Sequence, residues 1–272
     1  MPLLSARLRL LLVGLHLLFG MLQVAFLFHH AGESLRQRLK QVWSRQLIRL
    51  LGIRIESDID DLSGIEHGLL VGNHISFIDI FVINALAPSA FVAKSEVAQW
   101  PLIGWLARQA GTVFIERGSR KAAHLTHQHM QQALGAGRRL AIFPEGTTTA
   151  GHSLLPFHAA LFQSAIDAAV PVHAVALSYH GADGARSEAP AYIDDLSLTD
   201  CLLAVLQTPG LIARLSLAGS FAPPLPDRRH LAHRAHQAVA AALAHATDPR
   251  NRGVKPFQGP EQPLRNEAAI RQ

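Results

Sequence analysis

The chain has 272 residues, of which 49% are hydrophobic, and this length allows one large domain with a substantial core or two small domains. The net charge of +5 and the pI of about 10.0 indicate an anionic partner; with only 6% aromatic residues and no basic run interleaved with aromatics, we expect a membrane surface and no nucleic acid. Cys201 is the only cysteine, which excludes an internal disulfide and is typical of a protein in a reducing compartment.

The first distinctive segment is residues 10–28, which contain no Asp, Glu, Lys or Arg. At ~1.5 Å per residue, this segment is roughly 28 Å long as a helix, and a bilayer core is about 30 Å thick. The segment can therefore just span a membrane; a buried core helix is the alternative. A cleaved signal peptide is disfavoured because no small-x-small cleavage site follows the segment.

A basic amphipathic helix is predicted at residues 33–51. Its apolar residues recur at helical spacing and basic residues flank that face, as expected of a helix at an anionic lipid surface. An ordinary surface helix of the globular part is the alternative. The apolar segment and this basic helix together predict that residues 1–52 anchor the chain in the inner, cytoplasmic membrane. Basic residues are denser after the apolar segment than before it, so the positive-inside rule places the active domain in the cytoplasm.

From residue 53 to 247 short apolar runs alternate with helical patterns. This alternation predicts one α/β domain with a mostly parallel sheet flanked by helices. The expected strands are 68–72, 91–94, 112–115, 140–143, 172–177 and 211–217. The expected helices are 77–86, 103–109, 120–134, 160–168, 199–205 and 230–246. Residues 248–272 contain few large apolar side chains, and we predict a disordered tail there.

Residues 73–79, with the sequence NHISFID, follow the first of these strands at a turn into a helix. His74 and Asp79 lie five positions apart and can face each other across such a turn. A carboxylate that fixes the tautomer of a histidine prepares it to act as a general base. Ser76 and Asp79 also fit a helix-capping box, and the two interpretations are compatible.

Two further groups stand at or beyond strand ends. Arg117 precedes a loop that enters a helix, so it fits either a phosphate ligand or a surface salt bridge. Glu145 and Gly146 follow Pro144 in the sequence FPEGTTT, where the glycine permits close approach of a ligand to the backbone. The alternative for this second group is an ordinary β-turn.

Four segments in this order resemble the ordered motifs of the glycerolipid acyltransferase family, which includes the bacterial 1-acylglycerol-3-phosphate acyltransferases. They are NH-x4-D at 73–79, GTVFIER at 111–117, FPEGTT at 143–148 and VPVHAV at 170–175. The resemblance covers about residues 68–180. It implies that His74 and Asp79 are catalytic. It further implies a substrate-binding role for Asn73, Arg117, Glu145, Gly146 and Thr147.

The resemblance implies transfer of a fatty acyl group from acyl-CoA or acyl carrier protein to 1-acylglycerol-3-phosphate, giving phosphatidic acid, without a cofactor or a metal. Backbone N–H groups near residues 73–76 are candidates for stabilising the oxyanion. Where many members have Phe-Lys-x-Gly-Ala, this chain has Phe157-His158-Ala159-Ala160-Leu161, which is closer to lyso-ornithine-lipid acyltransferases. A lyso-ornithine lipid or another lysolipid is therefore the alternative acceptor. A non-catalytic membrane lipid-binding protein is a further alternative.

Overall fold

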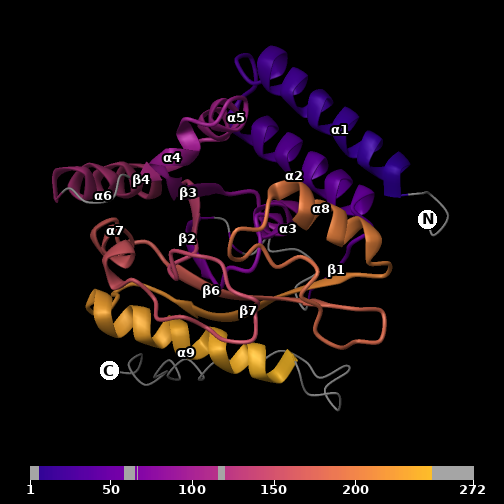
Figure 1. Ribbon diagram of the computed structural model, residues 1–272. Helices are drawn as coiled ribbons and strands as arrows, with labels where there is room; N and C mark the ends of the chain where they lie inside the picture. The colour runs from indigo at the N-terminus through magenta and orange to yellow at the C-terminus, as the bar shows by residue number, and fades with distance from the viewer. Residues whose placement is uncertain (1–5, 58–64, 66, 116–119, 247–272) are drawn as a thin grey trace, which may run out of the picture.

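The computed structural model describes residues 6–57, 65, 67–115 and 120–246, and it contains a seven-stranded sheet with helices on both faces (Figure 1). The predicted tail at 248–272 lies outside the described residues. The strands are β1 (Arg54–Ser57), β2 (Gly68–Gly72), β3 (Ala90–Lys94), β4 (Val113–Ile115), β5 (Arg139–Ile142), β6 (Val172–His180) and β7 (Ile212–Phe221).

The helices follow most of the predicted ranges. They are α1 (Ala6–Leu27), α2 (Glu33–Leu50), α3 (Ile78–Leu86), α4 (Ser95–Ala98), α5 (Ile103–Gln109), α6 (Arg120–Gly135), the 3-10 helix η2 (Ala159–Phe162), α7 (Gln163–Asp167), α8 (Leu198–Gln207) and α9 (Arg228–Ala246). The sequence did not predict the short elements β1 and α4. It predicted η2 and α7 as one helix.

The strand order is β1-β7-β6-β2-β5-β3-β4. The α/β class and the flanking helices are confirmed, and the sheet is mixed. The five strands from β6 to β4 run parallel to one another, whereas β7 is antiparallel to β6 and β1 runs parallel to β7. Apolar runs reveal a strand without revealing its direction, so the sequence could not identify the reversed pair.

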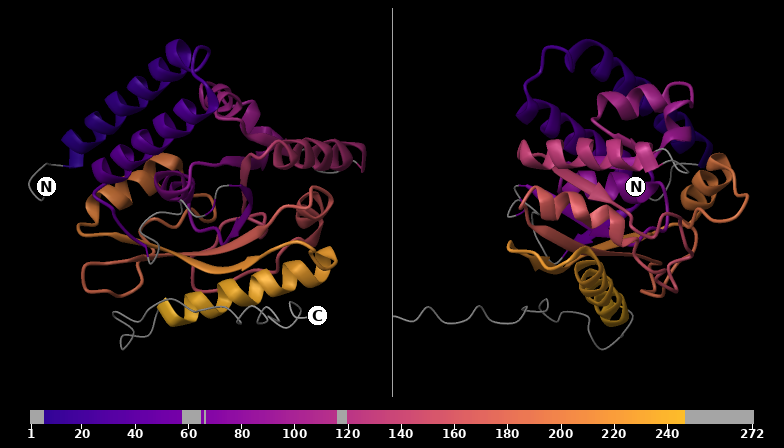
Figure 2. Two further views of the ribbon diagram at one scale, coloured as in Figure 1. Left: turned by 180° about the vertical axis from the view of Figure 1, so that it is seen from behind. Right: turned by 90° about the vertical axis from the view of Figure 1, so that its left-hand side faces the viewer.

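The central strand β2 separates two hydrophobic clusters. Leu69 and Val71 point to the cluster covered by α6, α7 and α9, and Leu70 points to the cluster covered by α2 and α3. All five residues of β2 are buried, which is why its sequence is a continuous apolar run without alternation. The views in Figure 2 show α9 on one side of the sheet and α2 on the other, with α1 outermost.

Helix α1 carries the one segment of the described chain that is long and apolar enough to cross a membrane, judged by length and composition. This segment, Arg7–Leu27, has a mean hydropathy of 2.3, and 17% of it is buried. The ring of His16 stacks on Trp43 of α2 at 4.8 Å, and a Cβ at Gly20 would meet the same indole at 2.4 Å. Helix α2 also packs on α3, with Ile48 1% exposed. The domain boundary at residue 52 stays a prediction.

Candidate active site

His74 and Asp79 come together at the carboxyl end of β2. His74 Nδ1 lies 2.8 Å from Asp79 Oδ2, and the side chains are 20% and 0% exposed, respectively. The imidazole also stacks on Phe143, with ring centroids 3.9 Å apart and planes 3° from parallel. The carboxylate and the stacked ring fix the orientation of the imidazole. Because Asp79 accepts the Nδ1 proton, the Nε2 lone pair is left for a substrate.

Every oxygen of the Asp79 carboxylate is hydrogen-bonded. Oδ2 also accepts the backbone N–H groups of Ile75 at 2.7 Å and Ser76 at 2.9 Å, while Oδ1 accepts the hydroxyl of Tyr179 at 2.8 Å. Four donors thus compensate the burial of this charge. The N-cap position of α3 is Phe77, with no side-chain cap bond, but the Asp79–Ser76 contact is the carboxylate half of a capping box. Asp79 therefore orients His74 and organises the start of the helix.

Glu145 joins the turn after β5 to the loop that carries His74. Its Oε1 accepts the N–H of His74 at 2.7 Å and its Oε2 accepts the N–H of Leu155 at 2.8 Å. Burial is the main cause that raises the pKa of Glu145, and the two amide bonds oppose it. Gly146 closes the turn onto Phe143 O at 3.0 Å with φ +72°, which favours glycine.

Asn73 joins the end of β2 to β6. Its side-chain amide donates to Leu177 O at 2.9 Å, and its side-chain oxygen accepts the N–H of Leu177 at 2.8 Å. Asn73 is 2% exposed. Thr147 is exposed beside the turn that contains Gly146. The substrate contacts predicted for Asn73, Glu145, Gly146 and Thr147 stay predictions; the contacts observed for Asn73 and Glu145 are with the protein's own backbone.

Arg117 lies outside the described residues, so its phosphate contact also stays a prediction. The expectation that backbone N–H groups near residues 73–76 stabilise the oxyanion is corrected by the structure. The N–H groups of His74, Ile75 and Ser76 already donate to carboxylates of the protein. Tyr179 was not singled out from the sequence. It lies in a strand whose residues are all buried, where an aromatic side chain is typical of a core.

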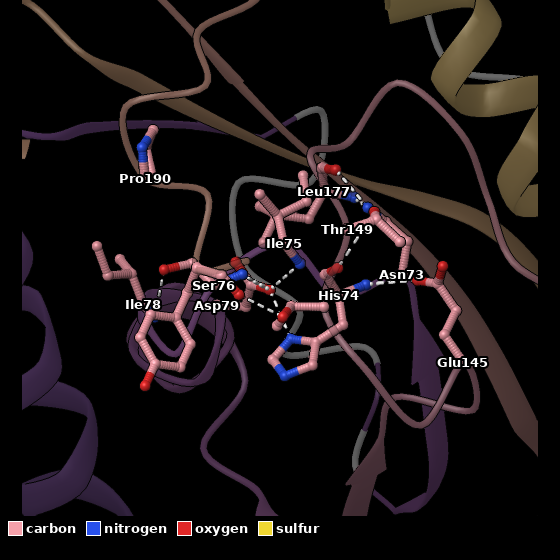
Figure 3. A network of polar contacts seen from close by, with 12 residues as sticks. Asn73, His74, Ile75, Ser76, Ile78, Asp79, Glu145, Thr149, Leu177 and Pro190 are labelled. Carbon is pink, nitrogen blue, oxygen red and sulfur yellow. Dashed lines mark hydrogen bonds and ion pairs between the residues drawn. The ribbon is translucent and has the colours of Figure 1, made fainter. Parts of the chain in front are cut away.

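The hydrogen bonds of Asn73, His74, Asp79 and Glu145 form one network over three adjacent strands, β6, β2 and β5 (Figure 3). The second ring nitrogen of His74 points away from the other residues of the network. An imidazole held by a buried carboxylate, with one nitrogen directed outward, can take a proton from a hydroxyl and later return it to a leaving group. The geometry thus fits general-base catalysis. A histidine that only stabilises a turn would not need this support.

The model of the family described as Acyltransferase matches residues 54–178. The chain is 41% identical over 213 residues to a lyso-ornithine lipid O-acyltransferase of Pseudomonas aeruginosa, covering 77% of this chain and 80% of that protein. This chain belongs to the glycerolipid acyltransferase family. The chain is also 39% identical over 181 residues to a 1-acyl-sn-glycerol-3-phosphate acyltransferase of Neisseria meningitidis serogroup B, covering 66% of this chain and 71% of that relative.

A solved structure has the same fold as this chain. The crystal structure of the 1-acyl-sn-glycerophosphate acyltransferase PlsC of Thermotoga maritima superposes with a TM-score of 0.62 at 21% identity, covering 88% of this chain and 97% of that one. Its similarity supports the arrangement of the sheet and the flanking helices. The range 54–178 that the family model matches contains His74, Asp79, Glu145 and Leu177, and it ends one residue before Tyr179.

Proposed function

We propose that this acyltransferase moves a fatty acyl group from a thioester to the free hydroxyl of a lysolipid. The observation that carries the proposal is the 2.8 Å contact of His74 Nδ1 with Asp79, which leaves Nε2 directed out of the network. Nε2 takes the hydroxyl proton as the lysolipid oxygen attacks the thioester carbonyl. The tetrahedral intermediate then collapses, the thiolate leaves, and the imidazolium returns the proton to the sulfur.

Asp79 serves this cycle without changing its own protonation. Its carboxylate faces the transient positive charge on His74 and holds the ring with Nε2 outward. No covalent acyl-enzyme is needed, because the hydroxyl attacks the thioester directly. Acyl-CoA and acyl carrier protein are both suitable donors, since each presents the same thioester.

For the acceptor we propose 1-acylglycerol-3-phosphate, with phosphatidic acid as the product. Arg117 is the residue we assign to its phosphate, because the guanidinium fork matches phosphate oxygens. A lyso-ornithine lipid is the second candidate, and two observations favour it. His158 replaces the lysine of many family members and Ala159 or Ala160 replaces their glycine, and the Pseudomonas aeruginosa relative is named for this lipid.

We also propose that α1 anchors the enzyme in the inner membrane with the active domain in the cytoplasm. The apolar segment Arg7–Leu27 supports the anchor, and the many basic residues of α2 support the orientation. Cell fractionation tests the anchor: the full-length chain should stay with the membranes until detergent is added. Recovery in the high-speed supernatant without detergent would rule it out.

The activity is tested with the purified full-length chain, both acyl donors and a panel of lysolipids that includes both candidate acceptors. His74→Ala should lower kcat roughly 10²- to 10⁴-fold, the usual contribution of a positioned general base. His129→Ala, an exposed histidine of α6, is the matched control and should keep wild-type kcat. Normal turnover of His74→Ala on the preferred acceptor would overturn the mechanism. The panel itself decides between the two acceptors.

A further inference from the structure

A cavity of about 330 Å³ lies near the amino end of β5, whereas the active site lies at the carboxyl ends of the strands. It is enclosed by the first turns of α2, the end of α5 and the residues that precede β4 and β5. Arg138 lines it just before the amino end of β5, whereas Phe143, which stacks on His74, follows the carboxyl end of the same strand. The cavity is therefore separate from the His74 network.

Four cationic side chains line this cavity together with one carboxylate. They are Arg36, Lys40, Arg108 and Arg138, and the carboxylate is that of Glu33. Arg36 and Lys40 are four residues apart on α2 and so share a face. Within the described part of the chain, none of the four forms an ion pair with a carboxylate, and Glu33 accepts a bond from the Gln37 amide instead.

The cationic side chains have N–H groups left to donate to a ligand. Lys40 Nζ donates to Ser89 O at 3.0 Å and Arg108 Nη1 donates to Ala98 O at 2.8 Å, which leaves their other N–H groups for a ligand. The Nε of Arg36 is buried and has no partner among the described residues. Burial lowers the pKa of Lys40 to about 8; the nearby carboxylate of Glu33 opposes this shift, and the charges of Arg138 and Arg139 add to it. A bound anion would offset this concentration of positive charge.

The position of the cavity indicates which anion it receives. Phe28 lines it, directly after the end of α1, and the preceding residues Phe26 and Leu27 are 70% and 47% exposed. If α1 lies in a bilayer, its end stands at the level of the lipid head groups. We propose that this cavity binds the phosphate group of an anionic membrane lipid, held by the guanidinium groups of Arg36 and Arg138 and by Lys40. Basic pockets beside membrane helices are suited to such head groups.

The test measures ligand-induced stabilisation of the full-length protein in neutral detergent, which does not depend on acyl transfer. Short-chain dihexanoyl phosphatidylglycerol should raise the Tm of the wild type, because a ligand that binds only the folded state stabilises it. Dihexanoyl phosphatidylcholine should not. In Arg36→Gln/Arg138→Gln the apparent Kd for the anionic lipid should weaken at least ~10-fold, since charge-assisted hydrogen bonds are lost.

The matched control removes the same charge from exposed positions of α2, as Arg38→Gln/Arg49→Gln, and should keep wild-type affinity. Arg36→Lys/Arg138→Lys keeps the charge without the forks and should recover part of the affinity, which guards against a folding defect in the glutamine variant. Equal weakening in the two glutamine variants, or in neither, would overturn the site. If inorganic phosphate at the same concentration raised the Tm equally, the cavity would be a site for free phosphate and not for a lipid head group.

Discussion

The hydroxyl of Tyr179 donates to Asp79 Oδ1 at 2.8 Å across 100 positions of the sequence. This contact connects the middle of the sheet to His74, because the other oxygen of Asp79 holds the imidazole. Burial, followed by the nearby charge of Asp79, raises the pKa of Tyr179 well above its usual value. Tyr179 therefore stays a neutral donor throughout the physiological range. We assign it as a positioning residue that acts through Asp79.

Tyr179→Phe removes this donor and leaves the rest of the side chain in place. A buried carboxylate oxygen without a partner costs about 1–3 kcal/mol, so Asp79 should reorient and align His74 less well. We expect kcat to fall ~10-fold with KM unchanged. Tyr192→Phe is the control and should keep both constants. A lower Tm with an unchanged kcat would make Tyr179 a core residue only.

Glu145→Gln tests the junction between the turn after β5 and the His74 loop. The amide replaces one acceptor oxygen by an N–H₂ group, so one of the two backbone donors, His74 N or Leu155 N, loses its partner. We expect kcat to fall ~10- to 100-fold and the Tm to decrease. Glu188→Gln, at an exposed side chain, is the matched control. If only KM for a phosphate-bearing acceptor rises, Glu145 instead orients Arg117.

The site residues differ in how far they could be predicted from sequence alone. His74 and Asp79 lie five positions apart at a strand end, so the local pattern contained their contact. Gly146 was likewise visible from its turn. The contact of Tyr179 depends on the register of β6 beside β2, and short-range spacing carries no information about it. The backbone partners of Glu145 were hidden for the same reason, since they lie 71 and 10 positions away.

The fold shows the same division between local and remote information. The bounds of β2 and α5 agree with the sequence prediction because both elements end at clear breaks in their apolar patterns. The edge strand β1 was missed because it is four residues long and only partly buried, so it lacks an apolar run. The packing of α2 on α3 was left open because an apolar stripe fits a lipid surface and a protein surface equally well.

Arg117→Ala separates binding of the acceptor from chemistry. If the guanidinium contacts the phosphate in both the ground state and the transition state, its loss should raise KM with little change in kcat. Charge-assisted bonds are worth about 1.5–3 kcal/mol, so KM should rise roughly 10- to 150-fold, and Arg117→Lys should recover only part of this. The measurement is steady-state kinetics on 1-acylglycerol-3-phosphate and on a lyso-ornithine lipid. An unchanged KM for the phosphate-bearing acceptor would remove Arg117 from its site.

His173 makes the stability of the sheet depend on pH. His173 of β6 is paired with Ser220 of β7, its Nδ1 is 2.9 Å from Ser220 Oγ, and burial lowers its pKa to about 4. As the pH falls below about 6.5, His173 takes up a proton in the unfolded chain, whereas in the folded chain it stays neutral until about pH 4. The free energy of unfolding should therefore decrease between about pH 6.5 and 4 and stay unaffected by His173 above this range. The full effect is up to about 3 kcal/mol.

The measurement is chemical unfolding of the full-length chain in detergent at several pH values between 4 and 8. His173→Gln keeps a polar side chain but cannot take up the proton, so its stability should fall less steeply than that of the wild type between pH 6.5 and 4. His129→Gln, at an exposed histidine of α6, is the matched control and should follow the wild-type curve. Parallel curves for the wild type and His173→Gln would show that the buried imidazole does not control this transition.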